Sequence, residues 1–265
     1  MGIVNVTPDS FSDGERYAEP DAAIQHGLEL IGQGADILDI GGESTRPGAG
    51  PVPPAEELRR VVPVVDGLAR QTTVPVSIDT SKAAVARACL SAGAAIVNDV
   101  TALRGDPEMV MAIQDFEAGV ILMHMQGTPQ TMQINPHYSD VMADISDFFE
   151  ERLKRAGDVG IAAEQIVLDP GIGFGKKSAH NREILVRLHE FQRFGQPLCL
   201  GLSRKGIICH LVGERSVEHR TAGGLGVLCH ALARQAVQIA RVHDVEETRD
   251  AIVAFEALGN PGRRQ

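Results

Sequence analysis

The sequence predicts a single α/β domain over residues 1–265, folded as a (β/α)8 (TIM) barrel. Short apolar runs rich in Val, Ile and Leu alternate with longer segments of helical period, and no linker or change of composition divides the chain. Aromatic residues make up only 4% and Trp is absent, so the core is expected to be aliphatic, as barrel interiors are. An open doubly wound sheet is the alternative, but the first strand leads into NVTPD (Asn5–Asp9), which lacks the Gly-rich phosphate fingerprint of such sheets.

Eight strand-and-helix units follow one another along the chain. Each strand is a short apolar run, and each helix is a longer segment in which apolar residues recur with helical period. The expected strands are Ile3–Asn5, Ala35–Ile40, Val76–Asp79, Ala95–Asn98, Val120–Met123, Ile166–Asp169, Leu198–Leu202 and Ile239–Val242. The helices expected after them are Pro20–Gln33, Pro54–Arg70, Lys82–Ala92, Pro107–Glu117, Asp140–Ala156, Ala179–Glu190, Glu218–Gln235 and Glu246–Leu258. Such a repeat closes into one parallel barrel.

The longest irregular stretches each follow a strand. They are Thr7–Glu19, Gly41–Pro53 and His124–Ser139. In a (β/α)8 barrel, the segments after strands gather at the carboxyl ends of the strands, where enzymes of this fold hold their active sites. The active site is therefore expected at that face.

Composition and charge exclude several classes of protein. With 28 Gly, 14 Pro and 43% hydrophobic residues, the chain resembles ordinary soluble globular proteins. The 35 acidic and 25 basic residues give a net charge of −10, which disfavours binding to nucleic acid or to an anionic membrane. Four sparse cysteines predict no disulfide framework, and no targeting segment or membrane-length apolar run is present. A cytoplasmic location is expected.

Nearly every expected strand ends in a chemically active group. These groups are Asn5, Glu43 with Ser44–Arg46, Asp79, Asn98, His124, Asp169, Ser203–Lys205, and Arg241 with His243 and Asp244. Asp, Asn, Ser and Thr also cap helices, and for Asp79 alone that interpretation is equally good. Capping does not explain Lys205, Arg241 and His243, so the set is predicted to converge on one site.

The convergent residues suggest two adjoining kinds of binding. Asp79, Asn98 and Asp169 offer acceptors and an amide, which suit a flat heterocycle with N–H donors such as an aminopyrimidinone. Cationic donors at Lys205, Arg241 and His243, with a neutral oxygen at Asn5, suit a phosphate or diphosphate with Mg²⁺.

Two other patterns carry less information. DPGIGFGK (Asp169–Lys176) resembles a phosphate loop but has Pro170 and Lys177 where a Walker motif needs Gly and Ser or Thr, so we interpret it as a turn that approaches a ligand and presents Phe174. The remaining histidines lack the spacing of zinc ligands.

The strand-end motifs resemble those of the dihydropteroate synthase family over almost the whole chain. The matching stretches, in order, are MGIVNVTPDSFSDG (Met1–Gly14), DIGGESTRPGA (Asp39–Ala49), VSIDTSK (Val76–Lys82), NDV (Asn98–Val100), HMQGTPQTMQ (His124–Gln133), DPGIGFGK (Asp169–Lys176), SRK (Ser203–Lys205) and RVHDV (Arg241–Val245). The resemblance implies a (β/α)8 barrel that condenses a pterin diphosphate with 4-aminobenzoate.

The resemblance also implies a role for each matching residue. The catalytic positions Asp79, Asn98, Asp169 and Lys205 would hold the pterin ring, against which Met123 would pack. The diphosphate would meet Asn5, Thr45, Arg241 and His243, with Asn5 as the ligand of Mg²⁺. The closing loops would carry Phe11, Asp13 and Arg46, and the aminobenzoate pocket would be lined by Phe174, Ser203 and Lys205.

The implied reaction is dissociative. The methylene C–O bond to diphosphate breaks first, and the aryl amine then attacks a cation delocalised into the pterin. Carboxylates around the ring suit this order, because they stabilise positive charge that develops as the bond breaks.

Four features depart from the family pattern. The chain starts on its first strand, so either the start is trimmed or the barrel bottom is covered in another way. Glu15, Gly206 and Gln235 replace residues that are usually Gly, Ser and Gly, which affects flexibility and packing more than chemistry.

Two alternative functions remain open, a pterin-binding methyltransferase and a non-catalytic pterin-binding paralogue. The retained Ser44–Arg46 loop, Lys205 and the Arg241–His243 motif favour the synthase. The family further implies a homodimer built on late helices and inhibition by sulfonamides. No inserted residue is evident around Thr45–Gly48 or Phe11–Gly14, which favours sensitivity to these inhibitors.

Overall fold

The structure is a computed structural model that describes residues 1–7, 18–46 and 48–259. Within this part of the chain it contains the eight predicted strands. They are β1 (Gly2–Asn5), β2 (Leu38–Gly41), β3 (Val76–Asp79), β4 (Ile96–Asp99), β5 (Gly119–Met123), β6 (Ile166–Asp169), β7 (Cys199–Gly201) and β8 (Ile239–Arg241).

The predicted helices are confirmed with small shifts at their ends, and one short helix is new. The helices are α1 (Ala18–Gly32), α2 (Pro54–Ala69), α3 (Ala83–Ser91), α4 (Met109–Asp115), α5 (Val141–Asp158), α6 (Ser178–Arg187), α7 (Ile207–Val212), α8 (Thr221–Ala233) and α9 (Val245–Gly259). Helix α7 has only 6 residues, too few to show a helical period in the sequence. The helix expected from Glu218 begins at Thr221, after the short 3-10 turn Val217–His219.

The strands form one closed parallel barrel. Strands β1 to β6 are hydrogen-bonded in sequence order, and β7 pairs with β8. Parallel bridges between Leu168 and Leu198 and between Gly2 and Val242 connect these two sheets at both junctions. The Ile3 amide donates to the Val242 carbonyl (2.9 Å), so the first and last strands meet. The barrel is therefore closed, and the open doubly wound alternative is wrong.

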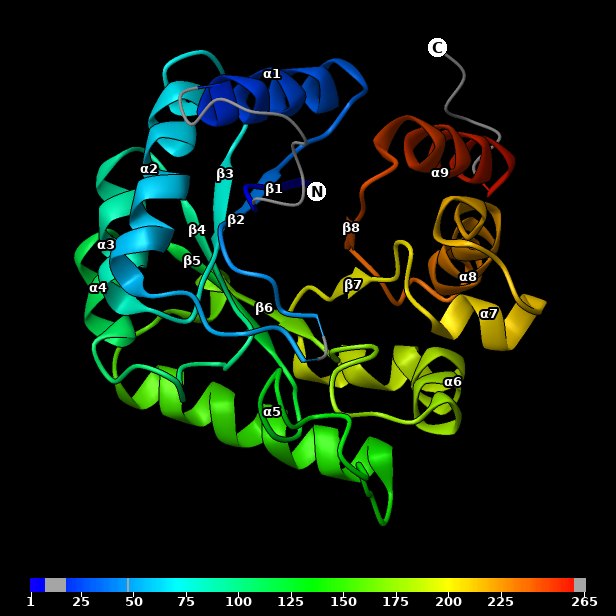
Figure 1. Cartoon of the computed structure of the whole chain (residues 1–265). Helices are drawn as coiled ribbons and strands as arrows, with labels where there is room; N and C mark the ends of the chain where they lie inside the picture. Colours follow the sequence, from blue (N-terminus) through cyan, green and yellow to red (C-terminus); the bar gives the residue numbers. More distant parts are fainter. Residues whose placement is uncertain (8–17, 47, 260–265) are drawn as a thin grey trace.

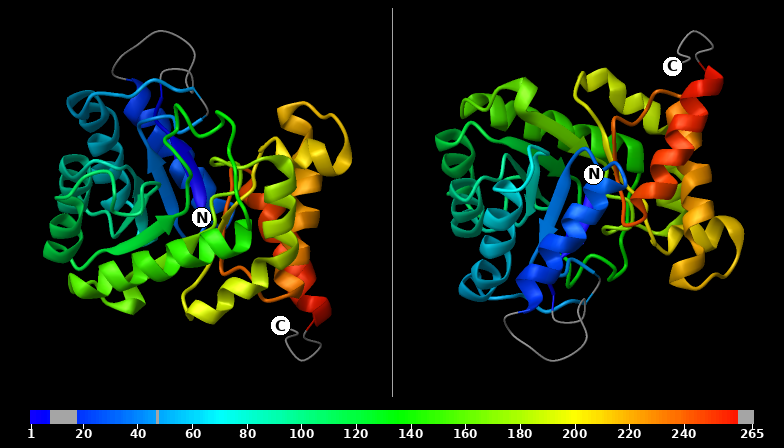
Figure 2. Two further views of the ribbon diagram at one scale, coloured as in Figure 1. Left: turned by 90° about the horizontal axis from the view of Figure 1, so that it is seen from below. Right: turned by 90° about the horizontal axis from the view of Figure 1, so that it is seen from above.

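Helices surround the strands on the outside. Figure 1 looks along the barrel, with α1 to α5 around β1 to β6 and with α7, α8 and α9 beside β7 and β8, and Figure 2 shows the same layers from two other directions. Helix α2 buries Val61, Val64, Val65 and Leu68. The core is almost wholly aliphatic, as predicted, and buried Phe149 meets both Phe191 and Phe194 edge to face.

The register of the first four strands places their polar end residues side by side. Asn5 is paired with Gly41, Gly41 with Asp79, and Asp79 with Asn98. Neighbouring positions in parallel strands carry side chains to the same side of the sheet, so these groups lie side by side at the carboxyl ends of the strands. The fold thereby fixes the site before any loop contributes.

Two further features bear on the composition of the chain. Among the described residues, we find no helix with the length and apolar character needed to cross a membrane. The four cysteines are free, with Cys89 and Cys199 buried and Cys209 and Cys229 half-buried.

Two of the departures from the family pattern have structural explanations. Gln235 follows α8 with a φ of 56°, in the left-handed region that favours Gly. Gly206 has open space where a Cβ would lie, so a Ser would fit there. Glu15 lies outside the described residues.

Replacing Gln235 by Gly should stabilise the protein. The left-handed backbone of a residue with a Cβ costs about 1 kcal/mol or more, and Gly removes this strain while keeping the backbone carbonyl that accepts from Gln192. We expect the free energy of unfolding to rise by about 0.5–1 kcal/mol in denaturant titrations. Gln235→Ala is the matched control and should bring no gain. A Gln235→Gly variant less stable than Gln235→Ala would contradict this explanation.

Candidate active site

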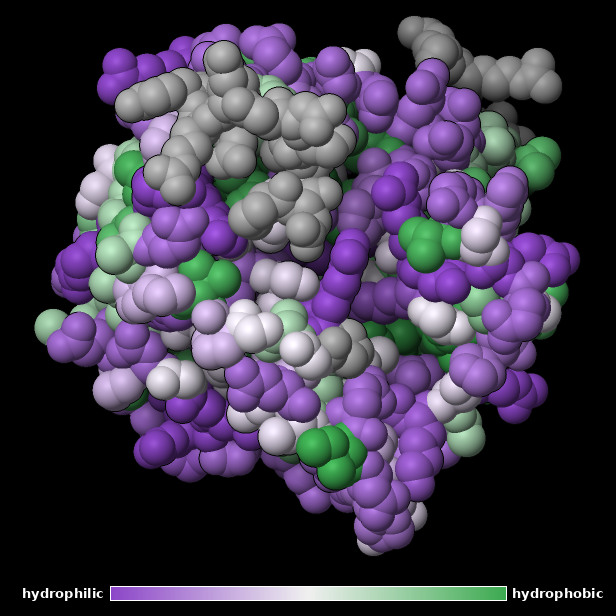
Figure 3. Space-filling view, viewed as in Figure 1, coloured by the Kyte–Doolittle hydropathy of each residue, from purple (hydrophilic) through white to green (hydrophobic). Residues whose placement is uncertain are grey.

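Three buried polar side chains mark the centre of the site. Asp79, Asn98 and Asp169 are only 8%, 5% and 7% exposed and end the strands β3, β4 and β6 or lie one residue before the end. The structure thus brings together the residues that were predicted to bind a heterocycle. Figure 3 shows hydrophilic side chains gathered near the centre of this face.

Asp39, on β2, is a central residue that the sequence-based site omitted. Its Oδ2 accepts from Asn98 Nδ2 (3.0 Å) and from Arg241 Nε (2.6 Å), while Arg241 Nη2 donates to Asp79 Oδ2 (2.8 Å). Asp39 is fully buried, and its Oδ1 has no hydrogen-bond partner among the described residues. An ionisable residue between Leu38 and Ile40 in an apolar strand was the signal available in the sequence.

The side chain of Asp79 serves the site and does not cap a helix. Helix α3 begins after Lys82 with no side-chain cap, and the Asp106 carboxylate accepts from the Ala83 amide (2.8 Å) instead. Burial raises the pKa of Asp79 to about 7, although the nearby Arg241 acts in the opposite direction. Asp79 is thus poised between its neutral and ionised forms near neutral pH.

Lys205 reaches the same centre from the turn after β7. Its Nζ donates to the Ile172 carbonyl (2.6 Å) and lies 4.7 Å from the centroid of the Phe174 ring. Burial lowers the pKa of Lys205 to about 8, against the pull of Asp169. Burial also raises the pKa of Asp169, which Lys205 opposes. A cation, a carboxylate and an aromatic face therefore adjoin.

A buried lysine, Lys176, binds the glycine-rich turn after β6 to the segment after β5. Lys176 Nζ contacts His124 Nδ1 (2.9 Å) and three carbonyl oxygens, those of His124, Gly171 and Phe174 (3.0–3.1 Å). Gly171 has a φ of 66°, and a Cβ there would lie 2.0 Å from the His124 carbonyl oxygen. The turn therefore packs against the backbone at the end of β5, and Lys176 is a second residue that the sequence-based site missed.

Met123 and Phe174 share one small apolar cluster near the carboxyl ends of the strands. Met123 is 3% exposed and packs with Val100, Met125 and Met132, and Phe174 contacts this cluster. Such side chains offer a surface on which a planar ring can stack. Met123, predicted to contact the pterin, and Phe174, predicted to contact the aminobenzoate, therefore lie in the same cluster.

His243 and Ser203 contact each other just after the ends of β8 and β7. Ser203 Oγ is 3.0 Å from His243 Nδ1 and accepts from the His243 amide (3.2 Å). Burial, Arg204 and Arg241 lower the pKa of His243 to about 4. His243 is therefore neutral near pH 7, which corrects the expectation of a cation, because burial and two neighbouring guanidinium groups oppose its protonation.

The loop after β2 carries two further residues that were predicted to contact the substrates. Thr45 is half-buried and Arg46 is exposed, but the charge of Arg46 contributes to the lowered pKa of His243. The Gly48 amide donates to the Pro129 carbonyl (3.3 Å), which connects this loop to the one after β5. Phe11 and Asp13 lie outside the described residues.

Asn5 offers a neutral oxygen at the rim of the site. A Cβ added to Gly41 would lie 3.8 Å from Asn5 Oδ1 and 3.9 Å from Asp79 Oδ2, so the two oxygens flank Gly41. Within the described residues, no group of three or more His, Cys, Asp or Glu side chains is placed to hold a metal ion. A single oxygen of this kind suits Mg²⁺ that arrives with a diphosphate, because Mg²⁺ usually takes few protein ligands beside phosphate and water.

Comparison with known proteins identifies the family. A family model described as "Pterin binding enzyme" matches residues 1–243. The dihydropteroate synthase of Escherichia coli K12 is 47% identical over 257 residues, which cover 97% of this chain and 90% of that protein. That of Neisseria meningitidis serogroup B is 45% identical over 264 residues, covering 98% and 92%. The chain belongs to the dihydropteroate synthase family of pterin-binding enzymes.

Solved structures of the family agree with this assignment. Xanthomonas albilineans dihydropteroate synthase with 4-aminobenzoic acid has a TM-score of 0.91 and 47% identity, covering 97% of this chain and 92% of that one. Yersinia pestis dihydropteroate synthase in a sulfonamide drug complex has a TM-score of 0.91 and 45% identity, covering 97% and 93%. The protein is a transferase of folate biosynthesis, and these relatives favour neither a methyltransferase nor a non-catalytic paralogue.

The two displaced pKa values predict a bell-shaped pH profile. Asp79 is ionised above about pH 7 and Lys205 is protonated below about pH 8, so kcat/KM should rise toward the first value and fall above the second. Steady-state rates between pH 5 and 10 test this. Lys205→Arg, whose guanidinium stays charged, should lose the alkaline limb at whatever rate it retains. An unchanged alkaline limb in that variant would show that another group titrates.

Proposed function

We propose that the protein joins 6-hydroxymethyl-7,8-dihydropterin diphosphate to 4-aminobenzoate, giving 7,8-dihydropteroate and diphosphate. One observation carries the proposal: the buried carboxylates of Asp79 and Asp169 lie at one barrel end with Lys205 and Arg241. Carboxylates are suited to a ring with N–H donors, and the cations are suited to anionic groups on either side of it.

The pterin ring is proposed to lie over the carboxyl ends of the middle strands. Asp79, Asn98 and Asp169 would accept from or donate to its edge, and Met123 would pack against its face. Lys205 would donate to the ring from the side of Phe174, since its Nζ already lies between the Ile172 carbonyl and that aromatic face. Bound substrate would also supply partners for atoms such as Asp39 Oδ1, which lacks one among the described residues.

The diphosphate is proposed to bind over the carboxyl ends of β1 and β8. Arg241 uses Nε and Nη2 for Asp39 and Asp79, so within the described part of the chain its Nη1 is available to the diphosphate. Neutral His243 would donate a hydrogen bond, and Thr45 would approach from the β2–α2 loop. Asn5 would be the protein ligand of Mg²⁺, which when bound neutralises charge on the leaving diphosphate.

The residues support a reaction in which the leaving group departs first. The methylene C–O bond breaks and its electron pair goes to the diphosphate oxygen, which Arg241 stabilises. The positive charge left on the pterin methylene is stabilised by the carboxylates of Asp79 and Asp169, whose effect is greatest in the transition state. The aminobenzoate nitrogen then forms the new C–N bond and loses a proton to solvent. A neutral aryl amine is nucleophilic, so no Ser-His-Asp arrangement is needed.

The aminobenzoate is proposed to sit beside Phe174. Its ring would stack on that aromatic face, and its carboxylate would be near Ser203, Lys205 and Arg46. A sulfonamide with the same aryl amine would occupy this pocket, and inhibition should therefore be competitive with 4-aminobenzoate.

A product assay with an Asp79 variant tests the proposal. Purified protein with Mg²⁺ and both substrates should release diphosphate and form dihydropteroate. Asp79→Ala should lower kcat/KM at least about 100-fold, because it removes a carboxylate aimed at developing positive charge. Asp66→Ala is the matched control, since Asp66 pairs with Arg70 on the surface (side chains 44% and 75% exposed) and should keep wild-type rates. Diphosphate release without aminobenzoate consumption, or a nearly active Asp79→Ala, would overturn the proposal.

The proposal includes a homodimer. An apolar groove of about 460 Å³ lies between α6, α7 and α8, and it is lined by Arg182, Leu185, Val186, Leu211, Val212, Ala222, Gly223, Gly226, Val227 and His230. Val186, Leu211 and Val212 are 40–44% exposed there. Clustered apolar side chains of this kind favour a protein contact, and a second copy of the chain is the partner that symmetry makes simplest. Of the two late helices expected to dimerise, α8 borders the groove, whereas α9 contributes none of its lining residues.

Sedimentation equilibrium tests the dimer. The wild-type protein should have twice the mass of the chain, and Val212→Glu should be monomeric because it places a charge in the apolar contact. Val253→Glu is the control, since Val253 is 53% exposed on α9, away from the groove. A monomeric wild-type protein would contradict the proposal, and so would a Val253→Glu variant that dissociates as readily as Val212→Glu.

A further inference from the structure

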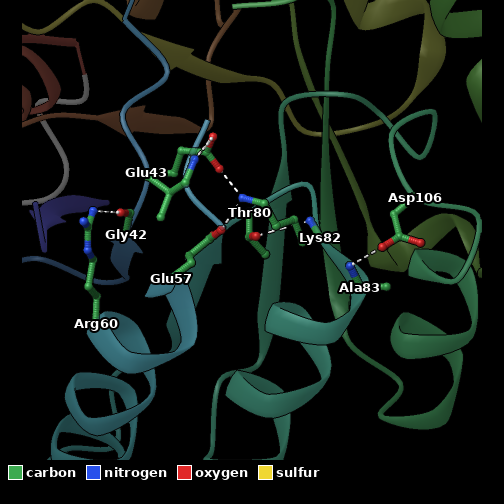
Figure 4. A network of polar contacts seen from close by, with 9 residues as sticks. Gly42, Glu43, Glu57, Arg60, Thr80, Lys82, Ala83 and Asp106 are labelled. Atoms are coloured by element: carbon green, nitrogen blue, oxygen red, sulfur yellow. Dashed lines mark hydrogen bonds and ion pairs between the residues drawn. The ribbon is translucent and has the colours of Figure 1, made fainter. Parts of the chain in front are cut away.

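The β2–α2 loop is held at its base by a charged cluster that no role in the reaction explains. Lys82 Nζ makes ion pairs with both Glu43 and Glu57 (Figure 4). The three side chains come from different elements: Glu43 from the start of the loop, Glu57 from the first turn of α2, and Lys82 from the position just before α3. The cluster therefore joins the loop to the two helices beside it.

The charged side chains of this cluster are largely buried, so each carboxylate needs a partner. The side chain of Glu57 is fully buried, and those of Glu43 and Lys82 are 22% and 21% exposed. Glu57 Oε1 has no hydrogen-bond partner in the described part of the chain. Burial by itself would lower the pKa of Lys82, but its hydrogen bonds to Glu43 and Glu57 raise that pKa above the usual value. Lys82 is therefore charged, and without it two carboxylates would lie close together with little solvent.

Glu43 closes the loop on itself. While its Oε2 pairs with Lys82, its Oε1 accepts from the Val52 amide (3.2 Å), nine residues further along the chain. Beside it, Arg60 Nη1 donates to the Gly42 carbonyl (2.9 Å). A Cβ at Gly42 would lie 2.6 Å from Val61 Cγ1, so the backbone here is pressed against α2. One carboxylate thus fixes both ends of the segment from 43 to 52.

That segment carries Thr45 and Arg46, whose side chains have no comparable anchor in the described structure. Arg46 lies close enough to His243, which follows β8, for its charge to act on that imidazole, and β1 lies between β8 and β2 in the barrel. The positions of Thr45 and Arg46 depend on where the base of the β2–α2 loop is held. A shift of about 1 Å at a substrate-contacting group can lower the rate about 100-fold.

We propose that Lys82 is a positioning residue, which holds Glu43 against Glu57 so that the β2–α2 loop presents Thr45 and Arg46 to the diphosphate and to the aminobenzoate carboxylate. The inference rests on the proposed function, because it deepens the role of the same site. On this assignment, Lys82 affects the binding of the anionic groups of the substrates. It does not affect the binding of the pterin ring, which is proposed to lie against the strand ends.

Steady-state kinetics of Lys82→Met test this assignment. The KM values for 4-aminobenzoate and pterin diphosphate should rise about 10- to 100-fold, because the loop loses its anchor. The affinity for 6-hydroxymethyl-7,8-dihydropterin, which lacks the diphosphate, should be unchanged in calorimetry. Lys82→Arg keeps a cation between the two carboxylates and should restore most of the KM. Lys154→Met, which breaks a surface pair with Asp158, is the matched control and should behave as wild type.

A second variant covers the case in which Lys82→Met does not fold. Glu43→Gln leaves Glu57 paired with Lys82 and keeps an acceptor for the Val52 amide, so the melting temperature should be unchanged while KM rises in the same sense. If Glu43→Gln and Lys82→Met both keep wild-type KM values, the assignment is wrong. It is also wrong if pterin affinity and melting temperature fall together with the KM effect, because that marks a purely structural lysine.

The outcome is separable from the proposed function. Turnover by the wild-type enzyme tests the function, whereas the assignment of Lys82 depends on ratios between variants and wild type. Binding of inorganic diphosphate with Mg²⁺, measured without turnover, provides a second ratio. It should weaken about tenfold or more in Glu43→Gln and stay unchanged in Lys154→Met, and equal weakening in both would contradict the assignment.

Discussion

The active site depends on a guanidinium group held across the inside of a closed barrel. Arg241, from the last strand, meets Asp39 and Asp79 from the second and third strands, and Asn98 donates to the same Asp39 oxygen. Buried carboxylates are tolerated only when they are paired, because their desolvation is otherwise very unfavourable. The pairing is possible only because hydrogen bonds between β1 and the end of β8 close the sheet. Barrel closure and the charge arrangement of the site therefore support each other.

The same burial gives the site its chemical character. It brings the pKa of Asp79 up to about 7 and that of Lys205 down to about 8, while it keeps His243 neutral. Groups displaced in this way are sensitive to a bound ligand, since each new hydrogen bond or charge changes which form is favoured. The net charge of −10 describes the protein as a whole, and anionic substrates are attracted by the local cations Lys205 and Arg241. The attraction of anionic substrates therefore depends on the charges around the site and not on the net charge of the whole chain.

Two lysines that do not belong to the reacting centre organise the loops around it. Lys176 joins the glycine-rich turn to the end of β5, which places Phe174 and the Ile172 carbonyl beside Lys205. Lys82 joins the β2–α2 loop to α2 and α3. In both cases one amino group contacts several acceptors at once, which a side chain without N–H donors does not do. Precise sites on loops need such support, because loops lack the regular hydrogen bonds of strands and helices.

The order of the eight strands, the helices between them and the polar residues at the strand ends are determined by the sequence itself, because apolar periodicity is a local property. The family was also indicated by the sequence, because each motif is a short run of consecutive residues. These motifs surround Asp79, Asn98, Asp169, Lys205 and Arg241. Only the tertiary structure decided that Arg241 binds Asp39 and Asp79, that His243 is neutral and that Lys82 lies between two glutamates. These features depend on register and burial, which bring together residues up to 202 positions apart and so leave no periodic trace along the chain.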